Sequence, residues 1–126
     1  MAENQIRSYT IEARSTDTFG RVLCTARNHH FIVDGPVQNG CPGEAVNPGE
    51  LFLAGIAACG VELVQVIAKE QQLTPKSIGV EIVGTMDRSK PVRQDLSVFN
   101  SVNLRFRIDG VSGAQAADLV ERFKRR

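Results

Sequence analysis

The sequence predicts an α+β fold in a single domain, with antiparallel strands, one long central buried helix and a second, shorter helix. Three observations support this prediction. The chain has 126 residues, which is the size of one domain. A nearly continuous apolar run over residues 51–68 lies between two groups of strand-like segments. Two helices that are separated by strand pairs favour an α+β arrangement over a parallel sheet.

The N-terminal third is predicted to contain three strands and a loop. Residues 5–14 alternate loosely as a strand, and the turn-rich segment STDTFG follows them. Residues 20–34 divide into two short strands around a polar turn at Arg27 and Asn28. The next segment, GPVQNGCPGEAVNPG, holds four glycines and three prolines in 15 residues, which predicts a loop.

The long helix is predicted over about residues 48–71. Asn47 is a suitable N-cap residue, and Pro48 suits the first helical position because it needs no amide donor there. Glu50 lies three residues after Asn47, so the two side chains match a capping box with asparagine in the serine role. The start of this helix is therefore specified locally.

The apolar run inside this helix raises the question of what covers it. Its 18 residues, 51–68, contain only Glu62 and Gln65 as polar side chains, which is near the lower length for a membrane span. An acid and an amide argue against lipid, and a helix that is apolar nearly all round is buried inside protein. Gly55 and Gly60 fit close packing against another backbone. A single chain of this size can hardly cover such a helix, so we expect a homodimer, and we expect no membrane span.

The C-terminal half is predicted to form a strand pair and the second helix. Residues 76–87 alternate as a strand, residues 88–100 form a polar connection, and residues 101–109 alternate cleanly between apolar and polar side chains. Ser112 and Gln115 match a capping box, so a helix is expected to follow Ser112.

Composition excludes several functional classes. The 15 basic and 14 acidic residues give a net charge of +1, so no basic excess indicates binding to nucleic acid. Three cysteines are an odd number and do not indicate a disulfide framework. The N-terminal segment MAENQIRSY has no apolar run, which is not typical of a secretory signal. We expect a cytoplasmic protein.

Cys59 is the first candidate for chemistry, and its residues alone leave two interpretations open. A free cysteine in an apolar helix is often a packing residue. A reactive thiolate needs a cation, yet no arginine or lysine lies near Cys59 in the helix, and the carboxylate of Glu62 opposes ionisation. The helix dipole fades within the first turn and does not reach this position. A cation must come from another element, and Arg14 and Arg21 are the candidates.

A metal site is a further alternative. Cys24, His29, His30 and Cys41 carry groups that bind metals. The indication is weak because the chain has no Cys-x-x-Cys pair, and adjacent histidines on a strand point to opposite faces.

Taken together, these segments resemble the OsmC-like family of osmotically inducible protein C and the organic hydroperoxide resistance proteins. The resemblance rests on HHFIVDGP, on the glycine-rich loop and on NPGELFLAGIAAC at residues 47–59. It covers nearly the whole chain and implies one OsmC-like domain over residues 1–126. It also implies an intertwined homodimer in which the central helices pack together.

The resemblance implies a thiol peroxidase. Cys59 matches the family's reactive cysteine, which attacks an organic hydroperoxide and becomes a sulfenic acid. A second cysteine then forms a disulfide, which an external dithiol or a lipoylated protein reduces, so no bound cofactor is expected. A family arginine from the N-terminal strands stabilises the thiolate, and Arg21 or Arg14 matches it.

The sequence departs from the family pattern in two places. Gly49 stands where the family has a glutamate, and Glu50 is displaced by one residue, which turns a helical side chain by about 100°. Glu50 therefore either takes the glutamate's role of orienting the arginine or only caps the helix. The family's resolving cysteine would follow Arg126, so we expect a chain that is truncated or naturally short; Cys41 or Cys24 is a substitute. These departures favour an alternative function, a non-catalytic dimer that binds an apolar ligand between its subunits.

Overall fold

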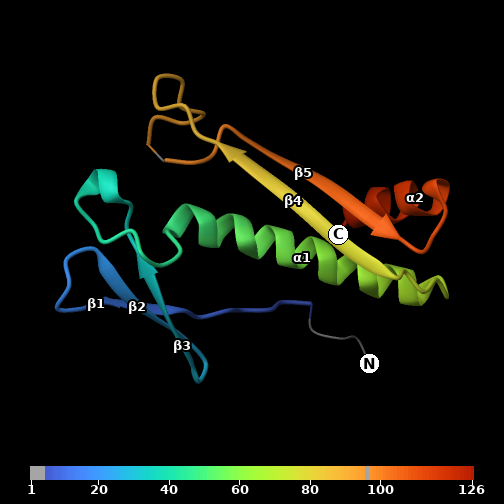
Figure 1. The fold of residues 1–126 in the computed structure, drawn as a ribbon, viewed down its shortest axis with the longest axis horizontal. Helices are drawn as coiled ribbons and strands as arrows, with labels where there is room; N and C mark the ends of the chain where they lie inside the picture. The colour runs from blue at the N-terminus through green and yellow to red at the C-terminus, as the bar shows by residue number, and fades with distance from the viewer. Residues whose placement is uncertain (1–4, 96) are drawn as a thin grey trace. The chain divides into compact units, whose positions relative to one another are not determined.

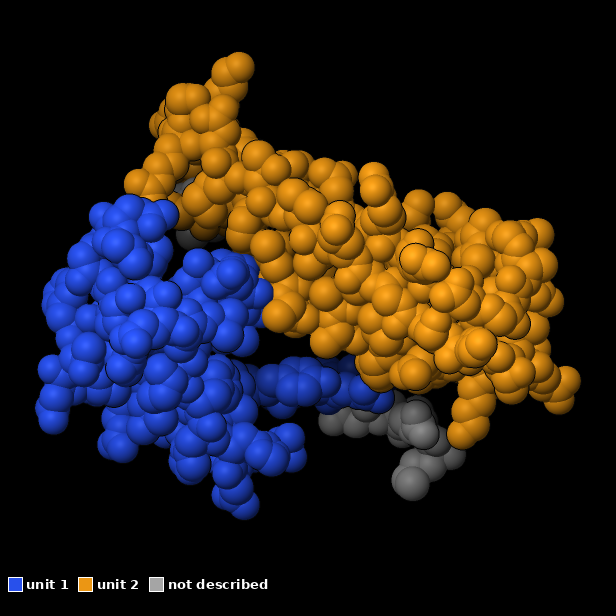
Figure 2. All heavy atoms as spheres, in the orientation of Figure 1, with its two compact units in different colours: residues 1–51 blue, residues 52–126 orange. Residues whose placement is uncertain are grey.

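The computed structural model describes residues 5–95 and 97–126, and these form five strands, two α-helices and one 3-10 helix (Figure 1). Both sheets are antiparallel, so the predicted α+β class is confirmed. The chain divides into two compact units, Met1–Leu51 and Phe52–Arg126, which Figure 2 colours blue and orange. Each unit has its own sheet and is described by itself.

The first unit is a three-stranded meander. Its strands are β1 (Glu12–Ser15), β2 (Arg21–Ala26) and β3 (His29–Asp34), in the order β1-β2-β3. The turn between β2 and β3 lies where the sequence predicts it, and Arg27 adopts a left-handed backbone with φ of 55°. The 3-10 helix Val37–Asn39 interrupts the segment that is predicted as a loop.

The register of β2 and β3 decides which side chains share a face of this sheet. Residues directly opposite each other in an antiparallel ladder point to the same side, and successive pairs alternate between the faces. One face carries Val22 opposite Val33 and Cys24 opposite Phe31. The other face carries Arg21 opposite Asp34, Leu23 opposite Ile32 and Thr25 opposite His30. Arg21, Asp34 and His30 therefore share the second face, whereas Cys24 and His29 lie on the first.

The first strand is shorter than the sequence predicts. The alternation indicates a strand over residues 5–14, whereas β1 covers only Glu12–Ser15. A strand exists only where a neighbour supplies ladder hydrogen bonds. Glu12 pairs with Thr25, and β2 ends one residue later at Ala26, so the β2 strand does not extend far enough to pair with the preceding segment.

The second unit contains two helices and a long hairpin. Helix α1 begins at Pro48, in the first unit, and continues to Glu70 in the second. Strands β4 (Ser77–Thr85) and β5 (Ser101–Asp109) pair along their whole length, and helix α2 (Gly113–Phe123) follows. The reciprocal capping box of Ser112 and Gln115 is present, so the predicted start of the second helix is confirmed.

The core of this unit lies where the C-terminal half of α1 packs against α2 and the hairpin. Val64, Ile67, Ala68 and Leu119 are buried and in contact. Five partly buried side chains pack around them: Leu73, Ile78, Phe106, Ile108 and Phe123. Gly60 is also buried. A Cβ atom at this position would lie 3.0 Å from the ring of Phe106, so a larger residue would crowd that ring. Close packing thus explains Gly60, although its neighbour is a side chain and not the predicted backbone.

The single chain covers the central helix along one stripe only. The prediction has a second copy cover the rest, and it stays a prediction because the structure describes one chain. Only Gly60, Val64, Ile67 and Ala68 of α1 are buried, all in its C-terminal half. The hairpin and α2 cover one stripe of the helix, while Phe52 remains 58% exposed. By length and composition alone α1 would pass as a membrane span, a test that core helices of other proteins also pass. The local sequence gives the helix its apolar character but does not identify what covers it.

Candidate functional site

Cys59 lies on the uncovered face of α1. Its side chain is exposed, in contrast to the buried thiol of Cys24. Helical spacing places its neighbours three, four and seven residues away on the same face. Of the six neighbours, Phe52, Gly55, Glu62 and Val66 are exposed, whereas Ile56 and Leu63 are half-buried. The thiol therefore lies on a mainly apolar surface that the single chain leaves exposed. Cys59 is not a buried packing residue within this chain.

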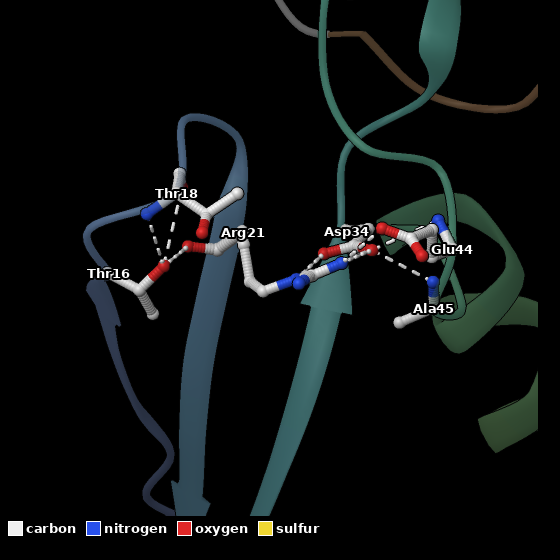
Figure 3. A network of polar contacts seen from close by, with 6 residues as sticks. All are labelled: Thr16, Thr18, Arg21, Asp34, Glu44 and Ala45. Carbon is white, nitrogen blue, oxygen red and sulfur yellow. Dashed lines mark hydrogen bonds and ion pairs between the residues drawn. The ribbon is translucent and has the colours of Figure 1, made fainter.

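Arg21 is held by two carboxylates in the first unit (Figure 3). Its Nε donates to Asp34 Oδ1 at 2.8 Å and its Nη2 donates to Asp34 Oδ2 at 2.9 Å. Nη2 also donates to Glu44 Oε1 at 3.1 Å. The guanidinium thus forms a two-point fork on Asp34 and a single contact with Glu44, and Nη1 takes part in none of these three bonds. The fork pattern is the strongest geometry for an arginine and a carboxylate.

The backbone of Arg21 is fixed as well. Its amide donates to the carbonyl of Thr18 at 3.1 Å. Its carbonyl accepts from Thr16 Oγ1 at 3.0 Å (Figure 3). Gly20, with φ of 80°, makes the tight turn that leads into the strand. Both ends of the side chain are therefore anchored, so the guanidinium has little freedom to reorient.

Asp34 is the buried centre of this arrangement, with none of its surface exposed. Its Oδ2 also accepts from the amides of Glu44 and Ala45, at 3.0 and 2.9 Å. The fork from Arg21 and these amides lower the pKa of Asp34 well below its usual range, against the opposing effect of burial, and the two carboxylates raise the pKa of Arg21. Because the folded pKa of Asp34 is depressed, its stabilising contribution is present at neutral pH and is lost as acid protonates it.

Glu50 is engaged at the helix start. The amide of Asn47 donates to Glu50 Oε1 at 3.0 Å, and the amide of Glu50 donates to Asn47 Oδ1 at 2.8 Å. This reciprocal pair is the predicted capping box with asparagine as the cap. Of the two roles left open for Glu50, the structure therefore shows the cap, and it assigns the contacts with Arg21 to Asp34 and Glu44.

Arg14 lies on the same sheet face as Arg21 but in a different environment. It borders a surface hollow that is also lined by Glu12, Leu23, Thr25 and His30. Within the described residues its side chain makes no ion pair or hydrogen bond. Arg14 is thus an exposed cation that no carboxylate holds among the described residues, whereas Arg21 is preorganised.

The candidate metal ligands are not brought together. No three of the side chains of Cys24, His29, His30 and Cys41 form a group that could hold a metal, as judged over residues 5–95 and 97–126. His30 instead shares a 2.9 Å hydrogen bond with Thr25 Oγ1 across the β2–β3 ladder. The described geometry gives the metal alternative no support.

Cys41 packs at the base of the Arg21–Asp34 pair. Its Sγ lies against Gly20 and Gly35, the residues that precede Arg21 and follow Asp34. The amide of Gly35 donates to the carbonyl of Gly20 at 2.8 Å, which brings the two glycines together beneath the thiol. A side chain on either glycine would take the space that Cys41 occupies.

Replacing Gly35 by alanine is expected to lower the free energy of unfolding by about 1–3 kcal/mol, the usual cost of overpacking. The new Cβ would lie 2.5 Å from Cys41 Sγ, so the loop or the strand must shift. Urea denaturation of Gly35→Ala in the wild-type and Cys41→Ala backgrounds measures the effect. The loss should shrink in the second background, and an equal loss in both would contradict this packing. Gly113→Ala is the control, because nothing lies within 4 Å of that position.

The two carboxylates that hold Arg21 are absent from the sequence-based prediction. Arg21 and Arg14 are predicted as candidates, but Asp34 and Glu44 are not. The signal for Asp34 was present, because pairing the two strands around the Arg27–Asn28 turn places Asp34 directly opposite Arg21. The candidates are divided between the units, with Arg14, Arg21 and Glu50 in the first and Cys59 in the second.

Solved structures with the same fold are numerous. An OsmC-like protein from Mycoplasma pneumoniae aligns with a TM-score of 0.80 at 16% identity, over 95% of this chain and 82% of the other. An organic hydroperoxide resistance protein OsmC from Legionella pneumophila gives 0.71 at 23% identity, over 97% and 85%. The organic hydroperoxide resistance protein OhrB of Bacillus subtilis gives 0.63 at 23% identity, over 94% and 84%.

Comparison of the sequence, as distinct from the fold, gives a family match. A search of curated protein sequences finds no match to this chain. The sequence model of the family described as OsmC-like protein matches residues 41–126, which are more than half of the chain. This chain therefore belongs to the OsmC-like protein family.

Proposed function

We propose that this protein is a cysteine-based thiol peroxidase that reduces organic hydroperoxides through Cys59. The observation that carries the proposal is the position of Cys59, exposed on an apolar helix face at the place where the family pattern has its reactive cysteine. A reactive cysteine must be reachable by its substrate, whereas buried structural cysteines are inert. Relatives named organic hydroperoxide resistance proteins share the fold.

The proposed reaction has two stages. The Cys59 thiolate attacks the terminal oxygen of the hydroperoxide, so that a sulfur–oxygen bond forms and the oxygen–oxygen bond breaks. The leaving alkoxide takes a proton and departs as an alcohol, and Cys59 becomes a sulfenic acid. One thiol of an external dithiol then forms a mixed disulfide with release of water. Its second thiol frees the Cys59 thiol and leaves an oxidised dithiol.

Arg21 is the proposed cation for this chemistry. An ordinary thiol is only a few per cent ionised at pH 7, so a fixed positive group is needed to hold the thiolate. Arg21 is preorganised by Asp34 and keeps its Nη1 group outside those contacts, while Arg14 has no such support. A fixed donor stabilises developing charge better than a mobile one.

The partners follow from the same proposal. The open apolar face of α1 supports a homodimer in which a second copy covers the helix. The reductant is a small dithiol or a lipoylated protein, and no bound cofactor is required. We propose a cytoplasmic location, where reducing conditions keep thiols available.

One observation favours a second function. Glu50 is held by the Asn47 cap, so the glutamate that the family pattern places near the arginine has no direct equivalent. A dimer that kept the fold without the reaction could bind an apolar ligand beside the exposed α1 face. In such a protein, an alkylating reagent would modify Cys59 slowly near pH 7, and peroxide would not be turned over.

The test follows hydroperoxide consumption by the whole chain with a dithiol, and then locates the oxidised cysteine. After one equivalent of an organic hydroperoxide, a sulfenic-acid trap should label Cys59, as identified by peptide mass spectrometry. Cys24 and Cys41 in the same molecules are the internal controls. Absence of turnover, or a label on Cys41 instead, would contradict the proposal, and the first result together with slow alkylation would support the ligand-binding alternative.

A further inference from the structure

We infer that Asp34 is the residue that positions Arg21 for the reaction, a role for which Glu50 is not placed. The inference rests on the proposed function in one respect, namely that Arg21 serves the Cys59 thiolate. Asp34 does not touch the reacting atoms in this scheme. It acts through the direction in which it holds the guanidinium, and is therefore a positioning residue.

The carboxylate of Asp34 cannot rotate without losing bonds. It accepts four hydrogen bonds, from Nε and Nη2 of Arg21 and from the amides of Glu44 and Ala45. Three of these bonds converge on Oδ2 and one reaches Oδ1, so a rotation of the carboxylate would break several of them together. Its residue is fully buried, and its own amide donates to the carbonyl of Val46 at 3.0 Å. Backbone and side chain are thus locked together.

This lock defines the orientation of Arg21. A guanidinium is planar, so fixing Nε and Nη2 on one carboxylate also fixes the direction of Nη1. Nη1 is then presented as a donor in a set direction, without the entropy cost of ordering a free arginine. A lysine at this position would keep the charge but would lose the fork and its direction.

The other two carboxylates are weaker candidates for this role. Glu44 makes one contact with Arg21, and its side chain is 76% exposed, which is typical of a surface pair with little energetic weight. Glu50 is occupied at the helix cap. Asp34 alone among the three combines full burial with a two-point contact to Arg21.

The same residue connects the arginine to the loop before the helix. The amides of Glu44 and Ala45 converge on Asp34 Oδ2, and the carbonyl of Val46 accepts from its amide. One carboxylate therefore holds both the arginine and the segment that leads to the Asn47 cap. Loss of its negative charge beside Arg21 would by itself favour a thiolate, so a raised alkylation midpoint in its absence would report the lost direction of Arg21.

A double-mutant cycle on the whole chain tests the inference with two readouts. The first is the pH dependence of Cys59 alkylation, and the second is the rate of organic hydroperoxide reduction. Asp34→Asn is expected to slow both about tenfold at pH 7, which corresponds to an alkylation midpoint about one pH unit higher. The double variant Asp34→Asn/Arg21→Ala should be no slower than Arg21→Ala alone, because Asp34 acts only through Arg21.

Two control variants separate positioning from general damage. Glu44→Gln removes one exposed contact to Arg21 and leaves the fork, so it should slow both rates by less than Asp34→Asn does. Asp118→Asn removes an exposed carboxylate that binds Arg122 Nε at 2.9 Å on α2, and should leave both rates unchanged. Additive losses in the cycle, or a wild-type alkylation midpoint in folded Asp34→Asn, would overturn the inference.

Arg21→Lys keeps the inference testable if Asp34→Asn does not fold. Positioning by the fork predicts a raised alkylation midpoint that matches Arg21→Ala, whereas a wild-type midpoint in Arg21→Lys would show that charge alone matters and would overturn it. The two proposals fail separately. If the wild-type chain does not turn over peroxide, but Asp34 and Arg21 are fully coupled in Cys59 alkylation, the peroxidase proposal is rejected and the positioning role is supported. If peroxide turnover occurs and Asp34→Asn does not change it, the peroxidase proposal is supported and the positioning role is rejected.

Discussion

Arg21→Ala is expected to slow organic hydroperoxide reduction about 100-fold at pH 7, while Arg14→Ala changes it by less than about twofold. A cation that lowers the midpoint of thiol ionisation by about two pH units raises the thiolate fraction roughly 30-fold at neutral pH. The remaining factor comes from losing a fixed donor beside the charge that develops on the leaving oxygen. Arg14 lacks the carboxylate fork that preorganises Arg21, so its removal should cost neither contribution.

Single-turnover rates between pH 6 and pH 10 check this prediction. The defect of Arg21→Ala should shrink as the pH rises above about 9, because the thiol then ionises without help. Arg14→Ala is a matched control, since it removes the same side chain from the same face of the first sheet. A larger defect for Arg14→Ala would reverse the assignment, and equal small defects would remove both arginines from the mechanism.

Elements with local signals are those that the sequence predicts well. The cap residues Asn47 and Glu50 predict the start of α1, and the reciprocal bonds between them confirm it. Ser112 and Gln115 do the same for α2. The alternation along β5 is equally local, because side chains of a strand point to opposite faces in turn.

Features that depend on distant neighbours were predicted poorly. The first strand is too long in the prediction because alternation says nothing about where the β2 ladder ends. The apolar composition of the central helix predicts burial with the help of a second copy, but a composition does not specify the surface that covers it. Burial and pairing are properties of the fold and not of the segment.

The candidate site contains features that the local sequence predicts and features that depend on distant neighbours. Arg21 was found as one of two arginines, but its pairing with Asp34 could also have been predicted from the hairpin, since residues equally far from the Arg27–Asn28 turn face each other. The contact with Glu44 could not, because it depends on how an irregular loop returns to the sheet. Cys59 is a candidate from its residue type alone, but the helix leaves a packing role open, and only the family pattern favours a reactive thiol.

Gly55→Gln is expected to break the proposed homodimer and to destabilise the protein, although the single chain predicts the opposite. No atom lies within 4 Å of a Cβ built at Gly55, so the chain has room for a larger side chain. Glycine inside a helix costs about 1 kcal/mol relative to good helix formers, and glutamine would therefore stabilise an isolated monomer. If a second copy packs its helix against this face, the new side chain overpacks the interface instead, at a cost of about 2 kcal/mol.

The sign of the change therefore decides whether α1 has a partner. A loss of about 2 kcal/mol weakens a dimer roughly 30-fold, which sedimentation analysis over a range of concentrations can measure. Gly113→Gln at the first residue of α2 is the matched control, because it also faces open space and should leave the association unchanged. A Gly55→Gln protein that melts at a higher temperature with unchanged sedimentation would contradict the dimer. It would also leave the apolar surface around Cys59 open to solvent, where a thiolate is reached by water as easily as by an organic substrate.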